Sequence, residues 1–216
     1  MPAELIKVYA KNPDMTRIRA VAKALREGAV VIYPTDTIYG LGCDIHQARA
    51  MERVARIKGI KLAKNDFSFI CYDLSHIADY ARVSNSAFKL MKRLLPGPFT
   101  FILEATNHVP KLLNANRKTV GIRVPDNDIA RLMVQELGNP LLTTTLREGG
   151  PLPNTTDYFS EEIAYSTDPE RMLEAYRHEV DIVIDGGPGG YVPSTIIDAT
   201  TDEFAIVRQG LGVVDW

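Results

Sequence analysis

The sequence predicts an α/β protein, α+β in some schemes, in which an open mixed β-sheet is covered by helices and the whole chain forms one domain. Helical and strand patterns alternate along most of the 216 residues, as they do in layered α/β folds. Some predicted strands follow one another without a helix between them, so we expect parallel and antiparallel pairs in one sheet. Hydrophobic residues make up 45% and charged residues 24%, which is ordinary for a globular domain.

The first helix is predicted to begin after Asn12, which can serve as its N-cap, with Pro13 at the first helical position. Apolar residues recur at helical spacing as far as Leu25, and Gly28 supplies a stop. A buried strand is predicted over residues 29–33, because an uninterrupted apolar run ends there at a proline, which cannot continue a ladder.

The remaining elements follow from the same two periodicities. Helical spacing, with caps or prolines at the ends, predicts helices over residues 47–58, 84–95, 128–137, 160–164 and 169–176. Short apolar or β-branched runs predict strands over residues 67–72, 99–103, 119–124, 141–145, 180–184, 195–198 and 204–208. The irregular stretch 147–159 is long for a compact domain and is a candidate active-site flap.

Several classes of protein are disfavoured by what the sequence lacks. No apolar run approaches the roughly 20 residues that span a bilayer, and no secretory signal is visible. Two cysteines cannot make a disulfide framework, and the four histidines show no metal-ligand spacing. We therefore expect a cytoplasmic protein with no membrane association, no tightly bound metal and no organic cofactor. Walker, dinucleotide and Gly-x-Ser-x-Gly motifs are also missing.

Charge is distributed unevenly along the chain. Residues 1–120 contain 19 lysines and arginines against 10 acidic residues, whereas residues 121–216 contain 6 against 17. The basic half fits an anionic partner, or the two halves face each other or are solvated. Its densest basic segment lies along one face of the predicted helix 47–58 and continues just past its end, and a solvated face is again the alternative. Candidate RNA contacts there are Arg49, Arg53, Arg56, Lys61 and Lys64.

A polar segment follows the first buried strand. Residues 34–42 read Pro-Thr-Asp-Thr-Ile-Tyr-Gly-Leu-Gly, which holds hydroxyls and a carboxylate at a strand end, where open sheets bind ligands. A polar turn between elements is the alternative interpretation. Residues 185–190, Asp-Gly-Gly-Pro-Gly-Gly, either offer backbone N–H groups to an anion or form only a turn.

Further candidate ligand contacts lie in predicted strands. Thr143 and Thr145 point the same way, because side chains alternate along a strand, and they could supply paired hydroxyls. The alternative is that threonine is simply common in strands. Arg123 and Arg208 each end a strand, where a fixed guanidinium can bind a carboxylate or a phosphate.

Five segments, in this order, resemble the YrdC-like superfamily, whose best-known members are threonylcarbamoyl-AMP synthases. The segments are residues 33–42, 96–100 (Pro-Gly-Pro-Phe-Thr), 120–125 (Val-Gly-Ile-Arg-Val-Pro), 194–198 (Ser-Thr-Ile-Ile-Asp) and 207–210 (Val-Arg-Gln-Gly). The likeness covers nearly the whole chain and implies a single YrdC-like domain over residues 1–216, without an additional C-terminal domain. It also implies an open twisted mixed sheet around a concave basic cavity.

The resemblance implies an activity that combines ATP, L-threonine and bicarbonate and releases pyrophosphate. Its product feeds the threonylcarbamoyl modification of adenosine in tRNA, and Mg²⁺ is expected to accompany the nucleotide phosphates. The family is also described as binding double-stranded RNA or tRNA. An RNA-binding protein without synthase activity is therefore the alternative hypothesis.

The family's site residues match positions of this chain. Thr37 and Arg123 match residues that contact threonine. The catalytic positions match Lys58, in the family's Lys-x-Arg motif, and Thr145, in its Ser-x-Asn motif. The positions that line the nucleotide match Lys58, Thr119, Thr143, Thr145, Ser194 and Arg208.

The chain departs from the family pattern at other positions, and the departures resemble the YciO branch. Ile60 replaces the arginine of Lys-x-Arg, and Arg147 replaces the asparagine of Ser-x-Asn. Ile70 takes the place of a histidine near the threonine site, with Asn65 as an adjacent polar residue. Isoleucine cannot make the charge-assisted bonds of a guanidinium, which are worth about 1.5–3 kcal/mol, so weak or altered synthase activity is expected.

Overall fold

The computed structural model describes residues 2–60, 62, 67–114, 118–146 and 166–216. Its strands are β1 (Glu4–Lys7), β2 (Val30–Tyr33), β3 (Gly40–Asp44), β4 (Ser68–Ile70), β5 (Ala81–Arg82), β6 (Phe99–Ala105), β7 (Thr119–Arg123), β8 (Leu141–Thr145), β9 (Ile182–Asp185), β10 (Thr195–Asp198) and β11 (Ala205–Arg208). Its helices are α1 (Met15–Arg26), α2 (Ala48–Lys58), α3 (Ile77–Tyr80), α4 (Asn85–Leu94), α5 (Lys111–Asn114), α6 (Asp128–Leu137) and α7 (Pro169–Tyr176).

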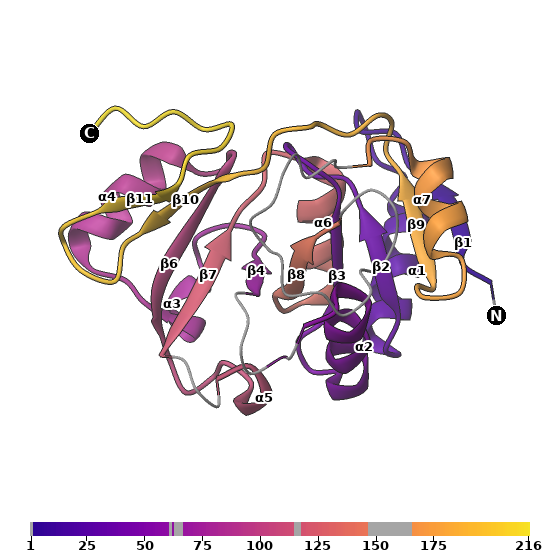
Figure 1. Ribbon diagram of the computed structural model, residues 1–216, viewed down its shortest axis with the longest axis horizontal. Coiled ribbons are helices and arrows are strands. Elements are labelled where there is room, and N and C mark those ends of the chain that lie inside the picture. The colour runs from indigo at the N-terminus through magenta and orange to yellow at the C-terminus, as the bar shows by residue number, and fades with distance from the viewer. Residues whose placement is uncertain (1, 61, 63–66, 115–117, 147–165) are drawn as a thin grey trace.

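One mixed sheet runs through the molecule. The strand order is β1-β9-β2-β3-β8-β4-β7-β6-β10-β11, and β5 pairs with β6. Parallel pairs such as β2 with β9 stand beside antiparallel pairs such as β2 with β3. The predicted α/β fold with an open mixed sheet is therefore confirmed. Figure 1 shows the long connection from β9 to β10 passing from one side of the molecule to the other.

Hydrophobic cores lie on both faces of the sheet. On one face, α1 and α6 pack against a cluster that includes Leu25, Tyr33, Ile70 and Met133. On the other face, α2, α4 and α7 contribute to a larger cluster. Neighbouring strand residues alternate between the two clusters, because successive side chains point to opposite faces. No helix of the described ranges is long and apolar enough to cross a bilayer.

The start of α1 differs from the prediction. The N-cap is Asp14, whose Oδ1 accepts a hydrogen bond of 2.8 Å from the backbone N–H of Thr16. The predicted cap, Asn12, lies outside the helix with a φ of 55°. Both residue types cap helices well, so the sequence alone did not distinguish two candidates that stand two residues apart.

The polar segment after β2 contains an element that the strand signals missed. Residues 40–44, which were assigned to no helix or strand, form β3, which is fully buried between β2 and β8. Its two glycines and one aspartate are poor strand formers, so tertiary pairing overrides local propensity here. The short elements β1, α3, β5 and α5 were also not predicted. The predicted helix 160–164 and the candidate flap 147–159 lie outside the described residues.

Candidate functional site

One face of the sheet carries a row of polar residues beyond its apolar core. On β8, Leu141 is in the core under α6, whereas Thr143 and Thr145, on the same face, line a cavity of about 310 Å³. On β4, Ser68 lines this cavity. The cavity therefore opens where the core of this face ends. Its lining residues are Ile38, Tyr39, Gly40, Lys58, Ile60, Ser68, Thr100, Arg123, Thr143, Thr144, Thr145, Ser194, Ile196 and Arg208.

Lys58 reaches this cavity from the last turn of α2, which Gly59 ends in the left-handed conformation at a φ of 73°. Its Nζ donates hydrogen bonds of 2.7 Å to both the carbonyl oxygen and the Oγ1 of Thr145. The two residues predicted to be catalytic are thus in direct contact. A positive charge is held against the end of β8, where an anionic ligand would meet it.

Arg123, at the end of β7, is the most enclosed charge of the site. It is 8% exposed and donates to Asp36 Oδ1 at 2.5 Å, to Thr37 Oγ1 at 2.7 Å and to Thr35 Oγ1 at 3.1 Å. Within the described residues, Arg123 Nε and Asp36 Oδ2 are buried without a partner. Buried polar atoms normally have partners, so these two atoms are exceptions within this network.

Thr37 has a different place from the one expected for a residue that contacts substrate. It is 2% exposed, bonded to Arg123, and is not among the residues that line the cavity. Its hydroxyl therefore supports the Arg123 guanidinium from behind.

Ser194 and Arg208 form the opposite wall. Ser194 Oγ and Thr100 Oγ1 are 2.9 Å apart and hydrogen bonded, and Arg208 donates to the carbonyl oxygen of Ser194 at 2.7 Å. Thr119 lines a smaller, adjoining cavity of about 140 Å³ that shares Ser68, Thr100 and Ile196 with the larger one. The structure thus gathers most of the expected nucleotide-binding residues around one hollow.

The two isoleucines that replace family residues differ in position. Ile60 is partly exposed and lines the cavity near Lys58. Ile70 is fully buried in the core with Tyr33 and Met133, and it does not line the cavity. The expectation that Ile70 stands inside the site is therefore wrong; Ser68, two residues earlier on the same face, lines the cavity instead. Arg147 and Asn65 lie outside the described residues.

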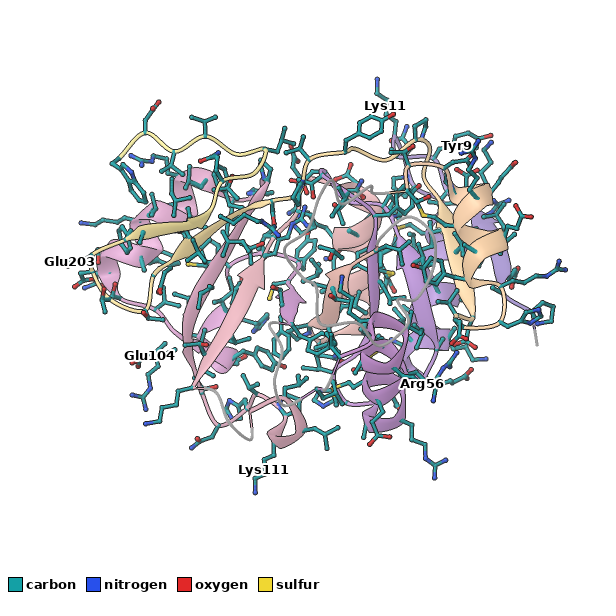
Figure 2. The ribbon with its side chains drawn as sticks, viewed as in Figure 1. Tyr9, Lys11, Arg56, Glu104, Lys111 and Glu203 are labelled. Atoms are coloured by element: carbon teal, nitrogen blue, oxygen red, sulfur yellow. The ribbon has the colours of Figure 1, made fainter. Side chains whose placement is uncertain are left out.

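The predicted RNA-contacting arginines of α2 differ in their contacts. Arg53 donates to Asp181 Oδ2 at 2.8 Å and to the carbonyl oxygen of Glu179 at 3.0 Å, so its guanidinium fastens α2 to the chain before β9. Arg49 and Arg56 are exposed, and Figure 2 shows Arg56 at the edge of the molecule beside α2. The other two predicted contacts, Lys61 and Lys64, lie outside the described residues.

The glycine-rich loop after β9 uses its backbone N–H groups internally. Gly186 donates to Tyr39 Oη at 3.1 Å, Gly187 to Asp185 Oδ1 at 3.0 Å, and Gly190 to the carbonyl oxygen of Thr37 at 2.8 Å. Gly189 likewise donates to a backbone carbonyl, that of Thr167. Of the two interpretations, the structure favours a turn over an anion-binding loop.

The polar residues at or next to the cavity that were not predicted as site residues include Tyr33, Tyr39, Ser68 and Thr100. Burial raises the pKa of Tyr39 to about 12, and its hydroxyl donates to the carbonyl oxygen of Gly187 at 2.7 Å. Ser68 and Thr100 were missed because the alternation of side chains shows only which residues share a face of their own strand. It places them on the same face of the sheet as Thr143 only when the strand pairing is known. The described residues contain no cluster of three or more acidic, histidine or cysteine side chains that could hold a metal.

A larger cavity, of about 400 Å³, lies elsewhere, between the segment after β4 and the end of α6. Its lining includes Tyr72, Asp73, Asp79 and Gln135 and none of the predicted site residues. Cavity size alone therefore does not single out the candidate site, which is chosen for its convergence of cations and hydroxyls.

Comparison with known proteins identifies the class to which this fold and site belong. The Sua5/YciO/YrdC family model, whose description is telomere recombination, matches residues 23–210. The chain belongs to this family. The match covers every element from the second half of α1 to β11.

Individual relatives place the chain within the family more closely. It is 40% identical to Escherichia coli YciO over 98% of both chains, and the crystal structure of that protein superposes with a TM-score of 0.85. It is 32% identical to the threonylcarbamoyl-AMP synthase of Bos taurus over 93% of this chain and 72% of that protein. The structure of P. abyssi Sua5 complexed with L-threonine superposes with a TM-score of 0.83 at 26% identity, over 96% of this chain and 58% of that one.

Proposed function

We propose that the protein binds ATP and a small carboxylate substrate such as L-threonine in the 310 Å³ cavity and forms a threonylcarbamoyl-AMP-type adenylate more slowly than its synthase relatives. The observation that carries the proposal is the convergence of Lys58, Arg208 and Arg123 with three hydroxyl side chains on one hollow. Relatives named threonylcarbamoyl-AMP synthase, and a Sua5 structure with L-threonine, support the choice of reaction.

The proposed site has one group of residues for the nucleotide and another for the substrate carboxylate. Lys58 and Arg208 supply positive charge for phosphates, and Thr143, Thr145 and Ser194 supply hydroxyls on the same hollow. Thr119, on the adjoining cavity, lies within reach of the nucleoside end. Arg123, held by Asp36 and Thr37, binds the substrate carboxylate.

The proposed reaction needs no nucleophilic side chain. The threonine nitrogen attacks bicarbonate and water leaves, which forms a carbamate. A carbamate oxygen then attacks the α-phosphorus of ATP, and the bond to the β-phosphate breaks to release pyrophosphate. Such steps depend on positioning and on stabilisation of phosphate charge. We propose that Mg²⁺ enters with the phosphates of ATP and that the protein acts in the cytoplasm.

The reduced rate follows from Ile60. This side chain lines the cavity at the position where the family motif has a guanidinium. The loss of one charge-assisted bond, about 1.5–3 kcal/mol, corresponds to a roughly 10- to 150-fold loss in binding. The loss is larger if the charge acts mainly in the transition state.

Pyrophosphate release tests the proposal. ATP, L-threonine and bicarbonate are supplied together, and each is omitted in turn, with a synthase relative assayed alongside. We expect release that requires all three substrates and is at least tenfold slower than that of the synthase. A rate equal to the synthase would contradict the role given to Ile60. No release and no ATP binding would contradict the enzymatic proposal.

A second candidate function is binding of tRNA or double-stranded RNA through exposed Arg49 and Arg56. No ion pair is recorded for either side chain within the described residues, whereas Arg53 is engaged with Asp181. A gel-shift titration at several salt concentrations tests it, with Arg49→Ala/Arg56→Ala against the exposed control Lys92→Ala. We expect salt-dependent binding that only the double arginine variant weakens. Undetectable or salt-independent binding would exclude this candidate.

A further inference from the structure

We propose that Tyr33, which does not itself line the cavity, is a positioning residue that turns the hydroxyl of Thr143 into a hydrogen-bond donor aimed at an anionic oxygen of the ligand. The inference deepens the proposed function, because it assigns the chemistry that this part of the site recognises. The same reasoning applies to Thr145, whose hydroxyl oxygen accepts a hydrogen bond from Lys58 and whose proton is therefore left for a ligand.

Tyr33 lies directly behind the site wall. Its side chain is fully buried at the end of β2, and its hydroxyl lies 2.5 Å from Thr143 Oγ1. Thr143 is 8% exposed and lines the cavity. The hydrogen bond therefore joins a residue outside the cavity to one that lines it.

Gly40 in β3 makes the space for the Tyr33 ring. A Cβ at Gly40 would lie 2.9 Å from Tyr33 Cζ and Oη and 3.2 Å from Thr143 Oγ1. At Gly42 the closest approach is different, because a Cβ there would collide with the backbone carbonyl oxygen of Leu142. A side chain at position 40 would displace the ring, so Gly40 is matched to a tyrosine that reaches Thr143.

The direction of the hydrogen bond follows from burial. Burial raises the pKa of Tyr33, so the phenol keeps its proton. Within the described residues, Thr143 Oγ1 is the single recorded partner of this phenol. If Thr143 donated instead, the phenolic proton would be buried without an acceptor, which is strongly disfavoured. Tyr33 therefore donates, and Thr143 Oγ1 accepts.

Because Thr143 Oγ1 accepts from Tyr33, the hydroxyl proton of Thr143 points away from Tyr33. Thr143 borders the cavity, so this proton can be donated to a ligand there. Thr145, two residues along the same face, accepts a hydrogen bond from Lys58 Nζ, so its proton is directed elsewhere too. Residues two apart in a strand are separated by roughly 6.6 Å. Two hydroxyl donors at that spacing, beside a lysine, fit separate oxygens of a phosphate chain or of a comparable oxyanion.

A double-mutant cycle tests the inference with ATP, inorganic pyrophosphate and adenosine as ligands. The variants are Tyr33→Phe, Thr143→Val, Thr143→Ser and Tyr33→Phe/Thr143→Val. We expect Tyr33→Phe to weaken ATP and pyrophosphate about tenfold and to leave adenosine unchanged, which is a loss of about 1.4 kcal/mol. In the Thr143→Val background, Tyr33→Phe should have no further effect, and Thr143→Ser should retain most of the affinity.

The matched control is Tyr176→Phe, which alters a buried tyrosine of α7 away from the cavity and should change no affinity. Additive losses in the cycle, or an equal loss for adenosine, would show that Tyr33 acts only as a structural residue and would overturn the inference. Pyrophosphate binding without ATP binding would contradict the proposed function and leave this inference standing. Wild-type protein that binds neither anion would overturn it.

Discussion

At the scale of single residues, the site depends on a buried ion pair. Arg123 and Asp36 have side chains that are 9% and 10% exposed and approach to 2.5 Å. Burying two charges is costly, and the pair is tolerated because each charge satisfies the other and the two threonines add hydrogen bonds. One oxygen of Asp36 and the Nε of Arg123 nevertheless stay buried without a partner among the described residues.

Arg123→Met should lower the free energy of unfolding by about 3–5 kcal/mol, because it leaves the Asp36 carboxylate buried and uncompensated. Urea unfolding measures the change. The double variant Arg123→Met/Asp36→Asn removes the stranded charge and should recover at least half of the loss. Equal instability of the single and double variants would show that the charge of Asp36 is not the cause.

Ile60→Arg should strengthen ATP binding by about tenfold or more, because it returns a guanidinium to the rim of the cavity beside Lys58. Isothermal titration measures the affinity. Val213→Arg adds the same charge on the C-terminal tail, at a side chain that is 78% exposed, and should have little effect. An equal gain in both variants would mean that net charge alone attracts the nucleotide.

At the scale of elements, the sequence predicted the helices and strands whose apolar spacing matches the face that they bury in the fold. The helices α2, α4, α6 and α7 lie where apolar spacing predicted them. The strand β3 was not predicted, because its glycines are poor strand formers that allow close approaches, Gly40 to the Tyr33 ring and Gly42 to the carbonyl of Leu142. Lys58 and Thr145 were predicted as parts of one site through family resemblance, since they are 87 residues apart and only the fold brings them together.

Asp14→Ala should cost about 1 kcal/mol of stability, because the cap of α1 is lost. Asn12→Gly should cost nothing or stabilise slightly, because glycine adopts the positive φ of 55° more readily than asparagine. Thermal or urea unfolding of the two variants distinguishes them. A larger loss for Asn12→Gly would instead support Asn12 as the residue that organises this helix start.

At the scale of the whole molecule, the order of the strands is what converts scattered residues into a site. The cavity takes residues from β3, β4, β6, β7, β8, β10 and β11. Periodicity indicates that strands exist and which residues share a face, but it carries no information on which strands are neighbours. Ile70 was wrongly expected in the site for another reason, because the family resemblance matched it to a histidine near the threonine site, whereas its side chain lies in the core.

Stability should fall as the pH rises from 7 to 10. Burial raises the pKa of both cysteines and of Tyr33 and Tyr39, with Cys71 and Tyr39 at about 12. The unfolded chain loses these protons at ordinary values of 9.0 and 10.0, before the folded chain does, so alkaline pH favours unfolding.

Urea unfolding across this range should show a loss of roughly 3–4 kcal/mol, most of it from the two thiols. The variant Cys43→Ala/Cys71→Ala should show a shallower decline, because the thiols titrate first. Stability that is constant or rises up to pH 10 would contradict the burial of these groups.

Titration of the purified protein with ATP tests the identity of the cavity most directly. We predict that ATP binds the wild-type protein and that Lys58→Ala weakens binding at least tenfold, because Lys58 supplies a positive charge at the end of β8. The exposed control Lys92→Ala, on α4, should bind like the wild type. Failure of the wild type to bind ATP, or equal affinity of Lys58→Ala and wild type, would contradict the assignment of this hollow as a nucleotide site.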